Sequence, residues 1–403
     1  MGRYSFRVGG RDFRNVCVLL AVAVLAKLVL VLLLSAVPVA DVGKAIGLPE
    51  RFLYHNFDFF NGTTIERPLV DKLGDTYDSV YYMNIAESGY RLRAENRVFL
   101  NSFVDDRRKA RWPPGFIDDY CLYNWPFLYP LLIRVFSFLM GFSGAGIFVS
   151  NVFSLVAVAL AYVALRGYLD ESAALKASLL FVFYPYNLAY WTSAFSEPVF
   201  MVFVLAAWLA FDRGRFLLSG FFLMLAFFTR LPGVVLFAVF SLIFLMRYWG
   251  AGRAKVFSGL ASLNLFLIPV VWWMFGEVGS VTGHSVLSVT QLCMNYTLMP
   301  GGFVFDVTFL GLFFTYYAFT SVYLLRGIDR DLMVYCLVLM LFHIAVYNTG
   351  ASIGRYIGVI WPLFVYYGRR LDWLEAVVVS AMFFVLAFIM LELSANMVAF
   401  NIL

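Results

Sequence analysis

The chain has 403 residues, of which 62% are apolar and only 14% are charged, and its mean hydropathy is +0.82. These values exclude a soluble globular domain and predict an all-α polytopic membrane protein. The net charge of +5 identifies no partner until it is divided between the two sides of a membrane, and the sequence contains no nucleic-acid-binding motif. The aromatic content of 19% is typical of a protein with two membrane interfaces.

The first element is a basic N-terminus followed by a long apolar run. Residues 1–15 contain four arginines, and residues 16–39 are nearly all aliphatic. A cleaved signal peptide has a shorter apolar run and a small-residue cleavage site, so we predict a retained first transmembrane helix with a cytoplasmic N-terminus. Lys27 falls in the middle of this helix, where a charge is costly unless it faces protein or water.

Residues 40–125 form a long loop that is too polar to cross a membrane. Since a structureless loop of this length is improbable, we expect short helices along the membrane interface. The pattern from Val80 to Ser88 is that of a short amphipathic helix, and Gly89 is a stop signal. Asp78 is therefore expected at or just before the start of a helix. A carboxylate there most often caps free N–H groups, and a catalytic role is the alternative.

The remaining residues, 126–403, are predicted to form a transmembrane bundle. Its apolar segments lie at 126–142, 145–165, 172–192, 196–211, 216–230, 231–247, 256–275, 303–325, 331–349, 355–368 and 373–395.

Basic residues in the short connections between these segments indicate the topology. They are Arg166 and Lys176, Arg213 and Arg215, Arg247, Arg253 and Lys255, Arg326 and Arg330, and Arg369 and Arg370. All of them lie in the cytoplasm only if segment 126–142 does not cross, and this segment is short with Arg134 in its middle. We therefore predict about eleven spans, with the N-terminus inside and the C-terminus outside; if 126–142 crosses, everything after it inverts.

This topology brings polar stretches from distant parts of the chain to the outer face. They are Asp78, Ser196–Pro198, Thr229–Gly233, Ser352–Tyr356 and the loop 276–302.

Arg230 and Arg355 are the arginines of this group, and either of them alone could simply reach the nearest interface with its charged end. Two arginines beside a carboxylate form a more specific pattern, because a guanidinium matches phosphate and a carboxylate can take a proton from a hydroxyl. The pattern predicts transfer from a phosphate-linked donor to an alcohol. In this reading Asp78 is the base, and Arg230 and Arg355 neutralise the departing phosphate.

Other polar residues have simpler explanations. Glu197 before Pro198 is typical of a first helical turn, and Ser196 could be its cap. The three histidines and four cysteines show no ligand spacing, so we predict no metal site. One disulfide between Cys121 and Cys293 stays open as an alternative to free thiols.

Several motifs in chain order resemble those of glycosylphosphatidylinositol mannosyltransferase II and its prokaryotic relatives. The matching segments are Tyr77-Asp78-Ser79 with Tyr82 and Ile85 to Tyr90; Asn124 to Pro130; Tyr184-Pro185 through Phe195-Ser196-Glu197; Phe228 to Gly233; and Arg355-Tyr356 with Pro362. The resemblance covers residues 75–365. The chain differs from the family pattern at Tyr77, where the motif has Trp, at Leu231-Pro232, and in the extra basic stretch 91–123.

The resemblance implies a GT-C type integral-membrane glycosyltransferase. It implies a polyprenyl phosphate sugar donor, typically dolichyl phosphate mannose, inverting transfer without a nucleotide sugar or other cofactor, and a catalytic Asp at the position of Asp78. Tyr77, Tyr82, Glu197 and Tyr356 belong to the matching motifs and are expected to line the substrate site.

The departures bear most on the acceptor, for which we expect a glycolipid or a lipid-linked glycan. The enzyme is expected in the cell membrane of a prokaryote or the endoplasmic reticulum membrane of a eukaryote, with an extracytoplasmic active site. Two alternatives remain: the same fold using another sugar, such as glucose or arabinose, and a transporter or lipid flippase. A transporter is commonly built from inverted repeats, and the sequence shows none.

Overall fold

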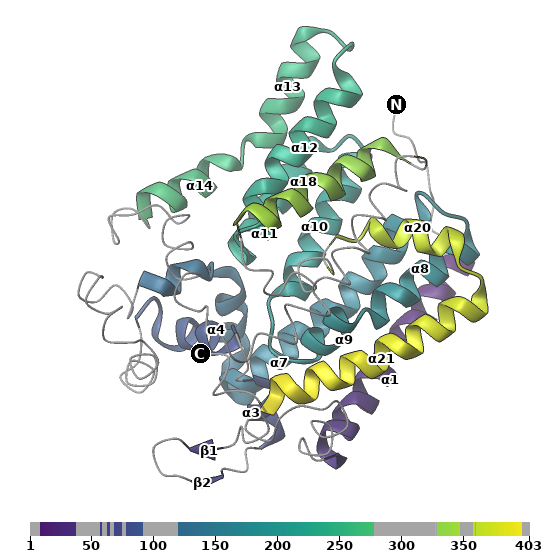
Figure 1. Ribbon diagram of the computed structural model, residues 1–403. Helices are drawn as coiled ribbons and strands as arrows, with labels where there is room; N and C mark the ends of the chain where they lie inside the picture. Colours follow the sequence, from purple (N-terminus) through teal and green to yellow (C-terminus); the bar gives the residue numbers. More distant parts are fainter. Residues whose placement is uncertain are drawn as a thin grey trace.

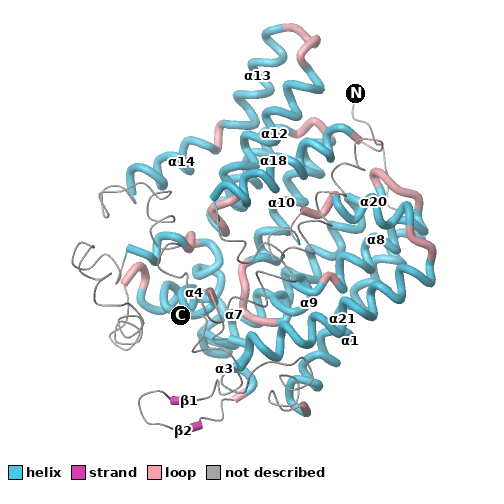
Figure 2. Tube along the Cα trace, in the orientation of Figure 1, coloured by secondary structure: helices cyan, strands magenta, loops and turns pink. Residues whose placement is uncertain are grey.

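The computed structural model describes residues 9–37, 57–58, 63–64, 68–74, 78–91, 120–277, 327, 329–346, 358 and 360–396. Within these ranges the chain folds into a bundle of helices, and the described part of the long loop lies against one end of it (Figures 1 and 2). A small hairpin in that loop pairs β1 (Phe57–Asp58) with β2 (Thr63–Thr64) in antiparallel register. The prediction of an all-α membrane protein is confirmed at this level.

The helices have the following bounds: α1 Gly10–Ala36, α3 Leu69–Gly74, α4 Ser79–Ser88, the 3₁₀ helix η2 Tyr120–Asn124, α7 Leu128–Arg166, α8 Glu171–Phe183, α9 Pro185–Thr192, α10 Glu197–Asp212, α11 Phe216–Thr229, α12 Gly233–Tyr248, α13 Arg253–Asn264, α14 Leu267–Val271, the π-helix η3 Trp272–Glu277, α18 Arg330–Val346, α20 Leu363–Arg370 and α21 Trp373–Asn396.

Three of the described helices are long and apolar enough to cross a membrane: α1, α7 and the Trp373–Glu392 part of α21. The number rises to five if two bent pairs each count as one span, namely α9 with α10, bent by 120°, and α13 with the following segment to Gly276, bent by 47°. These helices define a multi-pass membrane protein. The predicted span 303–325 lies outside the described residues, so the total of eleven stays a prediction.

Lys27 faces the interior of the bundle from the middle of α1. Its Nζ donates hydrogen bonds to Asn151 Oδ1 at 2.9 Å, Ser154 Oγ at 2.5 Å and the Trp191 carbonyl at 2.8 Å. A charged amine at membrane depth is tolerated when its donors are satisfied by protein groups. Of the two surroundings that the sequence left open for Lys27, protein or water, the structure shows protein.

Segment 126–142 is the first part of α7, and a break separates it from the rest of that helix. Met140 and Gly141 have non-helical backbone angles, and Gly141 has φ +72°, which favours glycine. The helical part before the break is about 18 Å long at 1.5 Å per residue, which is short of the roughly 30 Å hydrocarbon core of a bilayer. This length favours the topology in which 126–142 does not cross.

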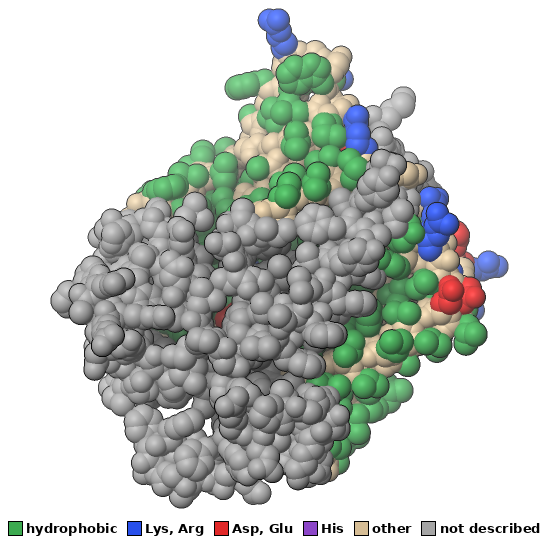
Figure 3. Space-filling view, viewed as in Figure 1, with side chains coloured by type: hydrophobic (Ala, Val, Ile, Leu, Met, Phe, Trp, Pro, Cys, Tyr) green, Lys and Arg blue, Asp and Glu red, His purple; other side chains and the backbone are tan. Residues whose placement is uncertain are grey.

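Basic side chains gather at one end of the bundle. On the face shown in Figure 3, Lys and Arg side chains lie over the α12–α13 turn and around α20, at the end opposite to β1 and β2. Because these side chains share one end of the bundle, their location supports the prediction that the basic connections lie on the same side of the membrane, as the positive-inside rule requires.

A buried charge cluster joins three helices at this basic end. Arg247 of α12 contacts Asp331 of α18 through Nε at 2.6 Å and Asp212 of α10 through Nη1 at 2.8 Å. Tyr168 donates to Asp212 at 3.2 Å, and the guanidinium lies 5.1 Å from the ring centroid of Phe211. In the sequence, Arg247 falls in a predicted cytoplasmic connection, and this cluster is not evident there because its members are far apart in the chain.

Helices α11 and α13 cross closely at Gly220. A Cβ atom at this position would lie 2.1 Å from the Leu263 carbonyl oxygen, and backbone has little room to move. Small residues permit such close helix crossings in membrane proteins.

We expect Gly220→Ala to lower the free energy of unfolding by about 1–3 kcal/mol, because the added methyl group overpacks the crossing. Thermal unfolding of the purified protein in detergent measures this. Gly250→Ala is the matched control, since a Cβ there would meet no atom within 4 Å. Equal unfolding temperatures for the two variants would contradict the close crossing.

Candidate functional site

Asp78 immediately precedes α4, as the sequence predicted, but it does not act as its cap. The helix begins at Ser79 and ends at Ser88, and Gly89 follows with φ +69°. Asp78 has helical backbone angles, φ −62° and ψ −18°, and its side chain makes no capping hydrogen bond. The simpler explanation of this carboxylate, as a helix cap, is therefore wrong.

Ser196 and Glu197 lie where the chain turns between α9 and α10, and both contact Arg230 at the end of α11. Arg230 Nη1 lies 2.8 Å from Glu197 Oε1 and donates to Ser196 Oγ at 3.0 Å. All three residues are buried. Ser196 occupies the N-cap position of α10 without making a side-chain capping bond, so its predicted role as a cap is also wrong.

Tyr82 connects this group to α4. Its hydroxyl lies 2.6 Å from Ser196 Oγ, and its ring packs edge-on against Tyr129 of α7, with centroids 4.9 Å apart. The Tyr129 hydroxyl in turn donates to the Gly146 carbonyl across the α7 break at 3.0 Å. The Ser196 hydroxyl therefore joins the helix that follows Asp78 to the arginine at the end of α11.

Asp78 lies one helical turn before Tyr82, whose backbone N–H donates to the Asp78 carbonyl at 3.2 Å. Burial raises the pKa of the Tyr82 hydroxyl; Arg230 opposes this change, and the negative charges of Asp78 and Glu197 add to it. Burial and Asp78 also raise the pKa of Tyr81. Both phenols therefore stay protonated at neutral pH and act as hydrogen-bonding groups. The charges of Asp78, Glu197 and Arg230 all act on the Tyr82 hydroxyl.

Three of the predicted site residues, Tyr82, Glu197 and Arg230, are brought together through Ser196, and Asp78 lies one helical turn before Tyr82. Tyr77, Arg355 and Tyr356 lie outside the described residues, as does the proposed pairing of Cys121 with Cys293. Cys17 and Cys336 are free thiols. Among the residues that the structure describes, no three His, Cys, Asp or Glu side chains gather in a way that could hold a metal ion.

Ser196 is the site residue that the sequence did not single out, since its spacing from Tyr82 and Arg230 gives no local signal.

We expect Ser196→Ala to lower the free energy of unfolding by about 1–3 kcal/mol, because two buried polar groups each lose a hydrogen bond. Tyr82→Phe in the same background should add little, since the bridge is already lost. Thermal unfolding of the single and double variants measures this coupling, with Ser262→Ala on α13 as control, since the Ser262 hydroxyl donates only to the Ser258 carbonyl among its recorded bonds. Additive effects would contradict a shared bridge.

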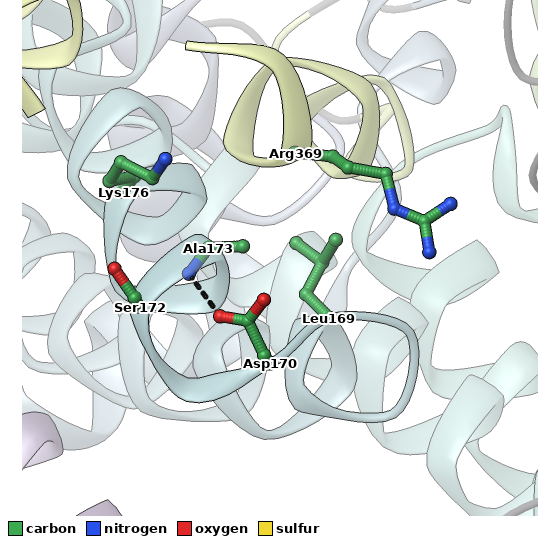
Figure 4. A pocket seen from close by; sticks show the side chains of 6 residues that line it. All are labelled: Leu169, Asp170, Ser172, Ala173, Lys176 and Arg369. Atoms are coloured by element: carbon green, nitrogen blue, oxygen red, sulfur yellow. Dashed lines mark hydrogen bonds between the residues drawn. The ribbon is translucent and has the colours of Figure 1, made fainter. Parts of the chain in front are cut away.

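A separate pocket of about 160 Å³ lies at the basic end of the bundle, between α8 and α20 (Figure 4). Asp170 projects into it and accepts a hydrogen bond from the Ala173 N–H at 2.9 Å, which caps α8. Lys176 donates to the Leu371 carbonyl. The polar groups of this pocket serve the ends of the two helices, and the pocket shares no lining residue with the site around Arg230.

The fold and the site together define an all-α multi-pass membrane protein with a buried carboxylate–arginine site. Compared with models of known protein families and with curated proteins, the chain matches none of them.

Proposed function

We propose that the protein is a GT-C type glycosyltransferase that moves mannose from a polyprenyl (dolichyl) phosphate to a hydroxyl of a glycolipid or lipid-linked glycan. The observation that supports the proposal best is that buried Arg230 is joined through Ser196 to Tyr82, one helical turn after Asp78, whose side chain does not cap that helix. A carboxylate and a guanidinium are the two groups that such a transfer requires.

The proposed reaction is a single inverting displacement. The acceptor oxygen attacks the anomeric carbon of the sugar while the bond from that carbon to the phosphate oxygen breaks. Asp78 takes the acceptor's proton, and the bonding electrons leave with the polyprenyl phosphate. Arg230, with Arg355 as the second predicted arginine, stabilises the negative charge that develops on the phosphate.

Membrane placement is part of the proposal. In Figure 1, α4 lies toward the end of the bundle that carries β1 and β2, away from α20 and the α12–α13 turn, which supports an extracytoplasmic reaction in the cell membrane or the endoplasmic reticulum membrane. Tyr82 is proposed to lie beside the bound substrate, as are Tyr77 and Tyr356. Glu197 is proposed to line the substrate site beside Arg230, with which it forms an ion pair at 2.8 Å.

A transfer assay tests the function. Purified protein receives radiolabelled polyprenyl phosphate mannose and a lipid extract of its own source membrane, and the product is identified by mass analysis. A labelled glycolipid supports the proposal. Product from a glucosyl or arabinosyl donor alone would keep the reaction class and change the sugar. Flux or lipid movement without any covalent product would favour the transporter or flippase.

A further inference from the structure

Arg230 is already paired with a negative charge before any phosphate arrives. The side chains of Arg230 and Glu197 are 9% and 4% exposed, and 2.8 Å separates their charged atoms. Asp78 is the other charged group that acts on Tyr82. These three side chains together carry two negative charges and one positive charge. A phosphate that approaches Arg230 therefore meets a guanidinium whose charge is compensated.

The proposed reaction raises the charge of the lipid carrier. A polyprenyl phosphate sugar is a phosphodiester with one negative charge. When the sugar–oxygen bond breaks, the released polyprenyl phosphate becomes a monoester, which carries nearly two negative charges above its second pKa of about 6. Attraction to a buried cation grows in proportion to ligand charge. An uncompensated arginine would therefore hold the product more tightly than the donor.

We propose that Glu197 is a counter-charge that limits the affinity of the site for the leaving phosphate and thereby speeds product release. This inference rests on the proposed function and adds that Glu197 acts on the leaving phosphate indirectly, through its ion pair with Arg230. Because repulsion by Glu197 acts twice as strongly on a dianion as on a monoanion, its removal favours the product over the donor. Ser196 still holds the guanidinium when Glu197 is changed, since its oxygen accepts from Nη1 at 3.0 Å.

Glu197→Gln tests the inference, because the amide oxygen can still accept from Arg230 while the charge is removed. The probes are farnesyl phosphate, a dianion at pH 8, and its methyl diester, a monoanion, and binding is measured by calorimetry in detergent without acceptor. If the monoanion binds about 5-fold more tightly to the variant, the dianion should bind about 25-fold more tightly, because the free-energy change doubles with charge. Glu197→Asp retains the charge and should keep the wild-type ratio of the two affinities.

Turnover supplies a second measurement. With donor and acceptor present, Glu197→Gln should show a burst of product equal to the amount of enzyme, followed by a steady rate at least about 5-fold slower than that of the wild type, in line with the tighter product binding. A merely structural loss would lower the burst and the steady rate together. The wild type alone also tests the idea: its affinity for the dianion should exceed that for the monoanion by less than about 3-fold, since Glu197 offsets the charge of Arg230.

Three results would overturn the inference: weaker binding of both probes to Glu197→Gln, an equal change for both, or a wild type that prefers the dianion by more than about 10-fold. Failure of the proposed function looks different, since the wild type would then form no glycosidic product, whatever its affinity for the two probes. If neither probe binds to the wild type or the variant, the site holds no phosphate and the inference is wrong.

Discussion

Replacing Asp78 by Asn is expected to abolish sugar transfer while leaving the fold nearly intact. The amide has the shape of the carboxylate but cannot accept the acceptor's proton. Since a positioned general base contributes roughly 10²–10⁴-fold to a rate, transfer should fall by at least about 100-fold. Asp78 makes no hydrogen bond that caps α4, so its replacement should not open that helix. Initial rates from labelled polyprenyl phosphate mannose measure the effect.

The matched control is Glu87→Gln on the exposed side of the same helix, α4. It removes one carboxylate from the loop without touching the buried site, and should keep transfer within about 2-fold, as expected of a surface change. Binding of the farnesyl diester to Asp78→Asn should equal or exceed wild-type binding, because one negative charge has left the site. If Asp78→Asn transfers sugar at more than about half the wild-type rate, Asp78 is not the base.

Replacing Arg247 by Met is expected to lower the free energy of unfolding more than Gly220→Ala or Ser196→Ala does. The guanidinium lies between Asp331 Oδ2 at 2.6 Å and Asp212 Oδ1 at 2.8 Å. Asp331 is only 1% exposed, so its charge cannot reach water when its partner is removed. Breaking a buried ion pair by deleting one partner costs about 3–5 kcal/mol, and here two carboxylates lose the same cation. Guanidinium or thermal unfolding in detergent measures the loss.

Arg213→Met is the control for this change, because Arg213 lies at the same end of the bundle, is exposed, and donates only to the Leu209 carbonyl among its recorded bonds. Its expected effect is within about 0.5 kcal/mol. Adding Asp212→Asn and Asp331→Asn to Arg247→Met should recover part of the lost stability, since the buried negative charges are removed with the positive one. Similar unfolding curves for Arg247→Met and Arg213→Met would show that the cluster is not a structural element.

The extents of individual helices could be predicted well because they depend on nearby residues. The apolar run 16–39 corresponds to α1 at Gly10–Ala36, and the pattern 80–88 with Gly89 corresponds to α4 at Ser79–Ser88. Segment 126–142 was separated from 145–165 by composition alone, and the structure instead continues both as α7 with a break at Met140 and Gly141. Glycine tolerates the backbone angles of that break, but glycine alone does not indicate whether a helix resumes after it.

The sequence by itself determined the class of protein, because hydropathy and helical periodicity are local properties that act over one or two turns. It also indicated that Asp78, Tyr82, Glu197 and Arg230 belong to one site. Only the tertiary structure decided how they are joined. Glu197 pairs with Arg230, and the Ser196 hydroxyl links Tyr82 of α4 to Arg230 at the end of α11. The same holds for Lys27 and Arg247, whose partners lie on other helices. Such contacts depend on how helices cross, and a side chain cannot show from its neighbours in sequence which distant charge will neutralise it.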